Sequence, residues 1–263
     1  MSFFDANNDQ IRRLVQKFTG YPINIDAESL REWIRQFDEN DWPLALKILD
    51  WVDYYNNPRI CGELHDFYQQ IQTRGCNINN SYFASFCPAG HSGEIILERF
   101  RFANNFKTRR FDRSFIHLSE LNLMYSVRGS SFFFIEDFIG TGNQTVEMWE
   151  RISNFVPPKN NLFLFVITGH EEGIERVEEE TPLEVICNRV IYDDMKIFSE
   201  ANQTFSRDEQ QRVRRYCENV EHWPEGYGGC QSKVIFFYRA PNNTISILRC
   251  NAPQWNGLFL RNL

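Results

Sequence analysis

Residues 130–145 have the sequence SSFFFIEDFIGTGNQT, and this stretch decides the fold class. Its four consecutive apolar residues, 132–135, are typical of a central strand that is buried on both faces of a parallel sheet. Glu136 and Asp137 follow at the carboxyl end of that predicted strand, where open α/β sheets bind their ligands. A glycine-rich turn comes next and leads into a helix predicted to begin at about residue 144. The stretch therefore predicts a strand, an acidic pair and a loop that together form a ligand site.

Short apolar runs separated by helical stretches continue on both sides of this segment. The predicted strands are 82–87, 114–118, 130–136, 162–168, 184–191 and one more within 233–248. The predicted helices are 92–104, 143–155, 170–179 and 206–220. This alternation predicts an α/β fold with a mostly parallel central sheet and helices on both faces.

The first 78 residues are predicted to form a small helical subdomain. Asp26 is placed to cap a helix whose apolar residues recur at spacings of three and four. Asp41, followed by a tryptophan and a proline, predicts a second cap with proline in the first turn. A third helix is predicted from about 59 to 73. We therefore expect a helical subdomain at 1–78, which covers a sheet edge or contacts a partner, and an α/β domain at 79–263.

Composition limits the class of protein. The chain has 263 residues, 42% of them apolar and 24 of them Phe, which indicates a folded protein with an aromatic interior. A formal charge of -7 argues against broad attraction to nucleic acid or to an anionic membrane. No apolar run approaches the roughly 20 residues that span a bilayer, and the seven cysteines contain no CxxC pair. We therefore expect a cytoplasmic protein with no membrane partner, and we interpret the basic cluster at 212–215 as a solvated helix face.

The acidic pair and the loop after it suit a phosphorylated sugar. Two adjacent carboxylates at a strand end accept hydrogen bonds from ribose hydroxyls, and a nearby Mg²⁺ offsets their charge. Glycines let successive backbone N–H groups turn inward, and the start of a helix adds partial positive charge, so the loop suits a phosphate. The alternative is a tight structural turn. The predicted phosphate-binding residues are Gly140, Thr141, Gly142, Asn143 and Gln144.

Residues 132–144 resemble the phosphoribosyl pyrophosphate (PRPP) motif of type I phosphoribosyltransferases. That motif has about four apolar residues, two acidic residues, two mostly apolar residues and a Thr/Gly-rich loop. The resemblance implies that Glu136 and Asp137 hold the ribose hydroxyls while the loop wraps the 5-phosphate. The chain departs from the motif at Gly140 and Gln144, where hydroxyl side chains are common. Phosphate binding would then depend more on backbone amides.

A second loop occupies the position where this fold places its contact with pyrophosphate. Residues 88–93, with the sequence PAGHSG, follow the first predicted sheet strand and open a helix. Such loops often carry Lys or Arg, whereas only His91 offers a cation here. His91 is either an ordinary loop residue or a ligand contact. By resemblance, the candidate pyrophosphate contacts are Gly90, His91, Ser92 and Gly93.

The chain as a whole resembles the bacterial PRTase-CE group of conflict systems. The shared features are a helical amino-terminal region, the G-x-SG turn at 90–93, the acidic FIGTG motif and a PNNT segment at 241–244, followed by WNGLFLR at 255–261. The chain departs from the group where prolines are usual, at 246–248 and Leu260. The resemblance implies an antiviral toxin effector with transferase chemistry that acts on a nucleotide or nucleic acid. It also implies defence-system partners, such as a retron reverse transcriptase.

Two other sets of polar residues can each be interpreted in two ways. The side chains of Asn242, Asn243 and Thr244 either satisfy their own turn or contact a base or ribose edge. The polar residues that follow the strand predicted at 162–168 either face the cleft or cap a helix; these are His170, Glu171 and Glu172.

Three functions remain open from the sequence. The first is an enzyme of phosphoribosyltransferase type, and the intact acidic pair favours it. The second is a nucleotide-sensing regulator without turnover, which the scarcity of cations near His91 favours. The third is a partner-binding protein that docks through its amino-terminal helices. An oligomer is compatible with all three.

Overall fold

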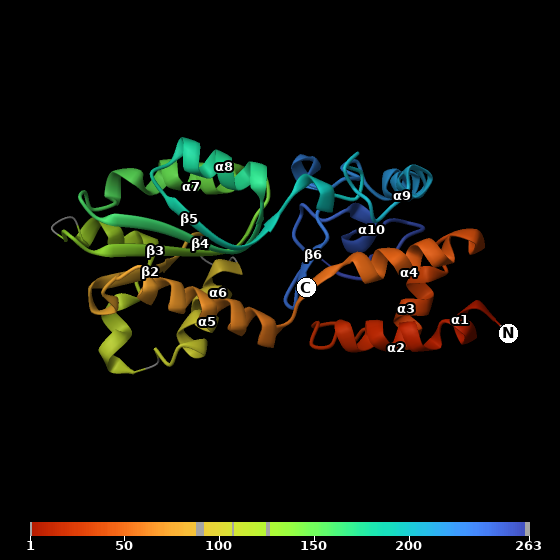
Figure 1. Cartoon of the computed structure of the whole chain (residues 1–263), viewed down its shortest axis with the longest axis horizontal. Helices are drawn as coiled ribbons and strands as arrows, with labels where there is room; N and C mark the ends of the chain where they lie inside the picture. Colours follow the sequence, from red (N-terminus) through yellow and green to blue (C-terminus); the bar gives the residue numbers. More distant parts are fainter. Residues whose placement is uncertain (1, 88–91, 107, 125–126, 261–263) are drawn as a thin grey trace. The chain divides into compact units, whose positions relative to one another are not determined.

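The computed structural model describes residues 2–87, 92–106, 108–124 and 127–260 (Figure 1). The chain forms two compact units, of which the first comprises Met1–Asn57 and Asp193–Leu263 and the second comprises Pro58–Tyr192. This division does not follow the boundary expected between residues 78 and 79. The third predicted helix belongs with the sheet, and the end of the chain belongs with the first helices. Hydrophobic periodicity identifies the buried face of a helix but not its long-range partner.

The second unit is built on a four-stranded sheet in which every pair of neighbours is parallel. The strand order is β2-β3-β4-β5. The strands are β2 (Ser81–Ser85), β3 (Ser131–Ile139), β4 (Asn161–His170) and β5 (Glu184–Ile191). In the register, Phe133 lies beside Phe83 of β2 and Phe163 of β4. The α/β fold with a parallel sheet is therefore confirmed.

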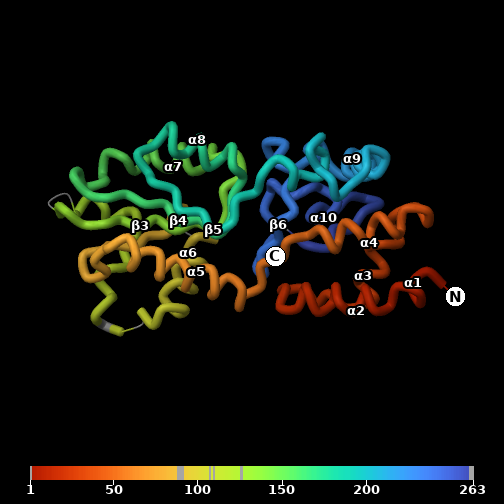
Figure 2. Tube along the Cα trace, viewed as in Figure 1, coloured from red at the N-terminus to blue at the C-terminus, as the bar shows by residue number. Residues whose placement is uncertain are grey.

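Helices cover both faces of this sheet, as Figures 1 and 2 show. They are α5 (Asn57–Thr73) and α6 (Ser92–Ala103) on one face, and α7 (Asn143–Ile152) and α8 (Glu171–Glu180) on the other. On the first face the ring of Phe67 stacks on Phe165 with centroids 3.7 Å apart. On the second face Val146 and Val177 pack in one cluster with Phe134. The alternation of side chains along β3 explains the two layers, because neighbouring residues of a strand point to opposite faces.

The strand predicted at 114–118 is wrong. The segment instead connects two 3-10 helices, η3 (Arg109–Ser114) and η4 (Leu118–Met124), and an isolated parallel bridge joins Phe115 to Phe83. The carboxylate of Glu120 accepts a hydrogen bond from the backbone N–H of His117 at 2.7 Å. That bond satisfies the His117 amide locally, directly after Ile116, whose N–H donates to the Phe83 carbonyl at 2.9 Å.

The first unit is mainly helical. Its helices are α1 (Phe3–Ala6), α2 (Asn8–Lys17), α3 (Ala27–Ile34), α4 (Trp42–Trp51), α9 (Arg207–Val220) and α10 (Ser246–Arg249). Two short parallel strands, β1 (Asp53–Tyr55) and β6 (Val234–Phe236), join the two ends of the chain within this unit. This unit also contains the 3-10 helices η1 (Glu39–Asp41), η6 (Asp193–Met195) and η7 (Tyr227–Gly229), whereas η2 (Ile78–Asn80) and η5 (Ser153–Phe155) belong to the second unit. The strand predicted within 233–248 is confirmed as β6, whereas β1 is too short to show in the sequence pattern.

The two predicted helix caps have different outcomes. Asp26 accepts a hydrogen bond from the backbone N–H of Ser29 at 2.9 Å and caps α3, as predicted. Asp41 precedes α4 but makes no capping bond. Its carboxylate instead accepts hydrogen bonds from Arg212 and from the hydroxyl of Tyr216. Asp41 is the N-cap residue of α4 and proline lies in the first turn, as predicted, but a long-range ion pair takes the carboxylate that would make the capping bond.

No helix among residues 2–87, 92–106, 108–124 and 127–260 is both long and apolar enough to cross a membrane.

Candidate functional site

The acidic pair lies near the carboxyl end of β3, in the middle of the sheet. The side chains of Glu136 and Asp137 belong to residues that are only 6% and 4% exposed. The strand extends to Ile139, three residues beyond its predicted end, so the pair lies inside the strand. Glu136 lies beside Val166 of β4 in the register. Ligands of open α/β sheets bind at the carboxyl ends of the strands, so the position of the pair favours a binding site.

A buried thiol lies next to the acidic pair. Cys87 follows β2, is 5% exposed, and its Sγ lies 3.0 Å from the hydroxyl of Ser85. Burial, together with the negative charges of Glu136 and Asp137, raises the pKa of Cys87 to about 11. The thiol therefore stays protonated at neutral pH and is a poor nucleophile. The register pairs Ser85, the last residue of β2, with Ile135, so both carboxylates follow directly after the carboxyl end of β2.

The loop after β3 has a geometry suited to an anion. Gly142 has φ 79°, in the left-handed region that favours glycine, and is the N-cap residue of α7. The backbone N–H of Asn143 donates to the hydroxyl of Thr141 at 3.4 Å. The first turn of α7, which the structure describes in full, contains no acidic residue. Backbone amides at such a helix start are available to an external acceptor, and the helix dipole favours negative charge there.

The donor groups fit a magnesium ion that is shared with a ligand. Glu136 and Asp137 supply carboxylate oxygens, which Mg²⁺ prefers. Within the described part of the chain, no group of three or more His, Cys, Asp or Glu side chains is placed to hold a metal. Mg²⁺ is commonly held by one or two carboxylates together with the phosphates of a substrate. A single carboxylate of the pair is therefore enough to suit Mg²⁺ that arrives with a phosphorylated ligand.

The polar residues after β4 divide between the core and the surface. His170 is 2% exposed, and its ring meets the ring of Phe138 edge-on with centroids 5.8 Å apart. Glu171 and Glu172 form the first turn of α8, where their charges favour the positive end of the helix dipole. The helix-start interpretation therefore accounts for both glutamates.

A comparison with known protein families identifies the family of the chain. The family model PRTase-CE matches residues 30–261, which is most of the sequence. The chain belongs to the PRTase-CE family. No curated protein matches it. Membership of PRTase-CE suggests a phosphoribosyltransferase-like function, and the matched region includes the acidic pair and the loop.

The second candidate loop of this PRTase-CE chain is described only in part. Gly90 and His91 lie outside the described residues. Ser92 and Gly93 open α6, and Ser92 is 3% exposed. A Cβ placed on Gly93 would lie 2.6 Å from the Ser85 hydroxyl and 2.8 Å from the Cys87 sulfur. The start of α6 therefore packs directly on the carboxyl end of β2, close to the acidic pair.

The PNNT segment of the PRTase-CE chain lies in the compact unit that contains both chain ends. The side-chain amide of Asn243 donates to the Tyr227 carbonyl at 3.0 Å, and the Thr244 hydroxyl donates to the Val234 carbonyl at 2.9 Å. Thr244 is fully buried. These bonds favour the interpretation in which the segment stabilises its own turn. Base or ribose contact stays a prediction, and the half-buried Asn242 is the member best placed for it.

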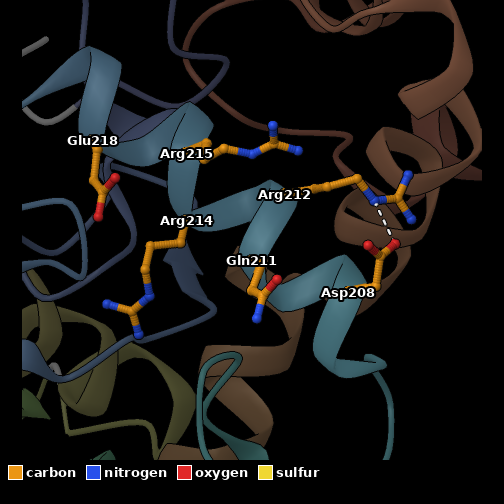
Figure 3. Close-up of a pocket in the computed structure, with 6 residues that line it drawn as sticks. All are labelled: Asp208, Gln211, Arg212, Arg214, Arg215 and Glu218. Atoms are coloured by element: carbon orange, nitrogen blue, oxygen red, sulfur yellow. Dashed lines mark ion pairs between the residues drawn. The ribbon is translucent and has the colours of Figure 1, made fainter.

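A hollow of about 500 Å³ runs along α9 in the same unit (Figure 3). It is lined by Asp208, Gln211, Arg212, Arg214, Arg215 and Glu218. Arg212 pairs with Asp208 at 2.9 Å and also with Asp41, and Arg214 pairs with Glu225. Most of the positive charge of this face is therefore neutralised within the unit, in agreement with a solvated helix face.

The sequence did not single out three residues of the site region. Cys87 is the last residue of the strand predicted at 82–87, so its position at a strand end was visible, but a lone cysteine carries no signal for a role. Gly173 and Arg176 lie within the predicted helix 170–179. Their contacts with the loop after β3 depend on how α8 packs on α7, which periodicity does not determine.

Proposed function

We propose that this PRTase-CE protein binds PRPP or a related ribosyl phosphate together with Mg²⁺. The observation that carries the proposal is the combination, on one strand and the loop after it, of a buried acidic pair and an amide-rich helix start. Glu136 and Asp137 accept hydrogen bonds from the ribose hydroxyls. Residues 140–144 bind the 5-phosphate through backbone N–H groups and the hydroxyl of Thr141. Family membership supports the same assignment.

The chemistry that follows is transfer of a ribosyl group. The bond between the anomeric carbon and the pyrophosphate oxygen breaks, pyrophosphate leaves with the electron pair, and a nucleophilic atom of the acceptor bonds to the carbon. Mg²⁺ held by the carboxylates of Glu136 and Asp137 would supply positive charge to offset that of the pyrophosphate. The chain contributes by orienting the sugar through Glu136 and Asp137 and by holding the phosphate end still. The buried thiol of Cys87 takes no covalent part, because its raised pKa keeps it protonated.

In the cell we propose a cytoplasmic antiviral effector. The toxin would transfer, remove or modify a ribosyl group on a nucleotide or nucleic acid, with Asn242, Asn243 and Thr244 as candidate acceptor contacts. A second protein of a defence system, such as a retron reverse transcriptase, would be its partner, and an oligomer is compatible with the fold. The support for this setting is the resemblance to the PRTase-CE group.

The second candidate function is a sensor that binds the same ligand without turnover. The described part of the second loop favours it, because Ser92 is buried and Gly93 has no side chain to offer pyrophosphate. A sensor and an enzyme would share the acidic pair and the phosphate loop. They differ only in whether pyrophosphate is released.

Isothermal titration with PRPP and MgCl₂ tests ligand binding. The double variant Glu136→Ala/Asp137→Ala should bind at least about 100-fold more weakly, because hydrogen bonds to charged groups are worth about 1.5–3 kcal/mol each. Glu147→Gln, which removes an exposed carboxylate on α7, is the matched control and should bind as the wild type does. Equal affinity of the double variant and the wild type would refute the site.

A pyrophosphate-release assay with nucleotides and nucleic acids then separates the enzyme from the sensor. Release that depends on Glu136 and Asp137 supports the enzyme, whereas binding without release supports the sensor. A third function, docking of a partner by the amino-terminal helices, predicts that the double variant keeps its activity in cells.

A further inference from the structure

The backbone of the phosphate loop rests directly on the backbone of α8. A Cβ placed on Gly173 would lie 2.0 Å from the carbonyl oxygen of Gly140 and 2.9 Å from Cγ2 of Ile139. Side chains do not occupy such distances, so only glycine permits this approach at position 173. The start of α8 therefore limits how far the loop can move toward α8 and away from a bound ligand.

The contact is reciprocal. A Cβ placed on Gly142 would lie 2.7 Å from the carbonyl oxygen of Gly173 and 3.3 Å from Cγ2 of Val177. Gly142 is also the N-cap residue of α7, with φ 79°. Two glycines thus face each other at the point where the loop turns into the helix. A change at either one would displace the amides that the phosphate needs.

One turn further along α8, a guanidinium holds the other end of the loop. Arg176 donates from Nη1 to the side-chain oxygen of Asn143, the first residue of α7. Its Nε pairs with Glu180 at 2.7 Å, which fixes the side chain along the helix. Because Glu180 offsets the charge of Arg176, what this arginine supplies to the loop is a fixed position for the side chain of Asn143.

We propose that α8 positions the phosphate loop. Gly173 sets its distance and Arg176 sets its orientation through Asn143. The affinity for a 5-phosphate is then controlled from a helix that carries none of the predicted ligand contacts. Arg176 and Gly173 are positioning residues in this arrangement. The inference rests on the proposed function, since it concerns the same loop.

Titration of the full chain with ribose 5-phosphate and MgCl₂ tests the role of Arg176. Arg176→Gln should weaken binding about 10-fold, which is about 1.4 kcal/mol. Arg176→Lys should restore most of the affinity, because a lysine ammonium can still donate to the oxygen of Asn143. In the background of Asn143→Ala, Arg176→Gln should cause no further loss. Arg151→Gln, which removes an exposed arginine at the other end of α7, should have no effect.

Gly173→Ala tests whether phosphate binding needs the close approach of α8 to the loop. It should weaken ribose 5-phosphate at least about 10-fold in protein that stays folded by circular dichroism. Gly62→Ala is its control, because a Cβ at this helical glycine meets nothing within 4 Å. If Gly173→Ala does not fold, the Arg176 and Asn143 variants decide whether α8 positions the loop.

The outcomes separate the two proposals. A wild-type chain that does not bind millimolar ribose 5-phosphate overturns the proposed function and the role of α8 together. A wild-type chain that binds, with Arg176→Gln equal to it, overturns the role of α8 alone. Losses from Arg176→Gln and Asn143→Ala that add in the double variant would mean that Arg176 touches the phosphate itself, which also overturns the positioning role.

Discussion

The substitution Gly93→Ala tests how tightly the start of α6 packs beside the acidic pair. The new Cβ would lie 2.6 Å from the Ser85 hydroxyl, 2.8 Å from the Cys87 sulfur and 3.4 Å from the Ile135 carbonyl oxygen. Overpacking of this kind costs about 1–3 kcal/mol. Alanine regains up to about 1 kcal/mol of helix propensity over glycine. We therefore expect a net loss of about 1–2 kcal/mol.

A second substitution measures the part that the Cys87 sulfur plays in this crowding. Cys87→Ala removes the sulfur that the new Cβ would meet, so Gly93→Ala should be less harmful in that background. The expected coupling between the two changes is about 1 kcal/mol. Gly62→Ala is the matched control and should be neutral or stabilising by up to about 1 kcal/mol, because its Cβ has open space.

Thermal unfolding followed by far-ultraviolet circular dichroism measures these effects. For a chain of this size, 1–2 kcal/mol corresponds to a fall in Tm of roughly 2–8 °C. Titration with PRPP should show weaker binding by Gly93→Ala, because Cys87 and the acidic pair lie beside the displaced helix start. A Gly93→Ala chain as stable as the wild type would refute the packing at this point. Losses that simply add with Cys87→Ala would refute the contact with the sulfur, since the Ser85 hydroxyl stays in place.

Three further substitutions test the core and the titration of the site. The thiol of Cys87 has a pKa of about 11 in the folded chain, against 9.0 for an unperturbed thiol. The free energy of unfolding should therefore fall as the pH rises between these values, and it should fall less steeply in Cys87→Ala. Urea unfolding at a series of pH values measures the difference. Phe67→Ala should cost about 3–5 kcal/mol in urea unfolding, because its buried ring stacks on Phe165; a loss below about 1 kcal/mol would contradict the packing. Asp41→Ala should cost about 2–3 kcal/mol by the same measurement, because it leaves Arg212 without its buried partner; an unchanged midpoint would contradict that role.

The sheet could be predicted because its central strand is continuously apolar. A run such as 132–135 has no polar face, so it indicates burial on both sides, and both helix layers follow from that. The acidic pair and the glycine loop were visible for the same reason, since they interrupt the apolar pattern at a strand end. The fold class and the family were therefore accessible from local sequence.

Long-range pairing could not be predicted in the same way. The apolar run at 114–118 looks like a strand, but Glu120 binds the amide of His117. Asp41 has the sequence context of a cap, yet Arg212, which is 171 residues away, takes its carboxylate. In both cases a side chain takes the group on which the prediction depended, from three residues away at His117 and from a distant helix at Asp41.

The parallel order of the sheet explains why the site residues gather at one edge. Each connection from β2 to α6, from β3 to α7 and from β4 to α8 leaves the sheet at the carboxyl end of its strand. The three connections therefore meet along one edge even though they are separated in sequence. The first carries Cys87 and Gly93, the second carries the phosphate loop, and the third carries the start of α8. Because the start of α8 supports the phosphate loop, a change in α8 should alter the affinity for the ligand although α8 does not contact it. The change in ribose 5-phosphate affinity caused by Arg176→Gln measures this effect directly.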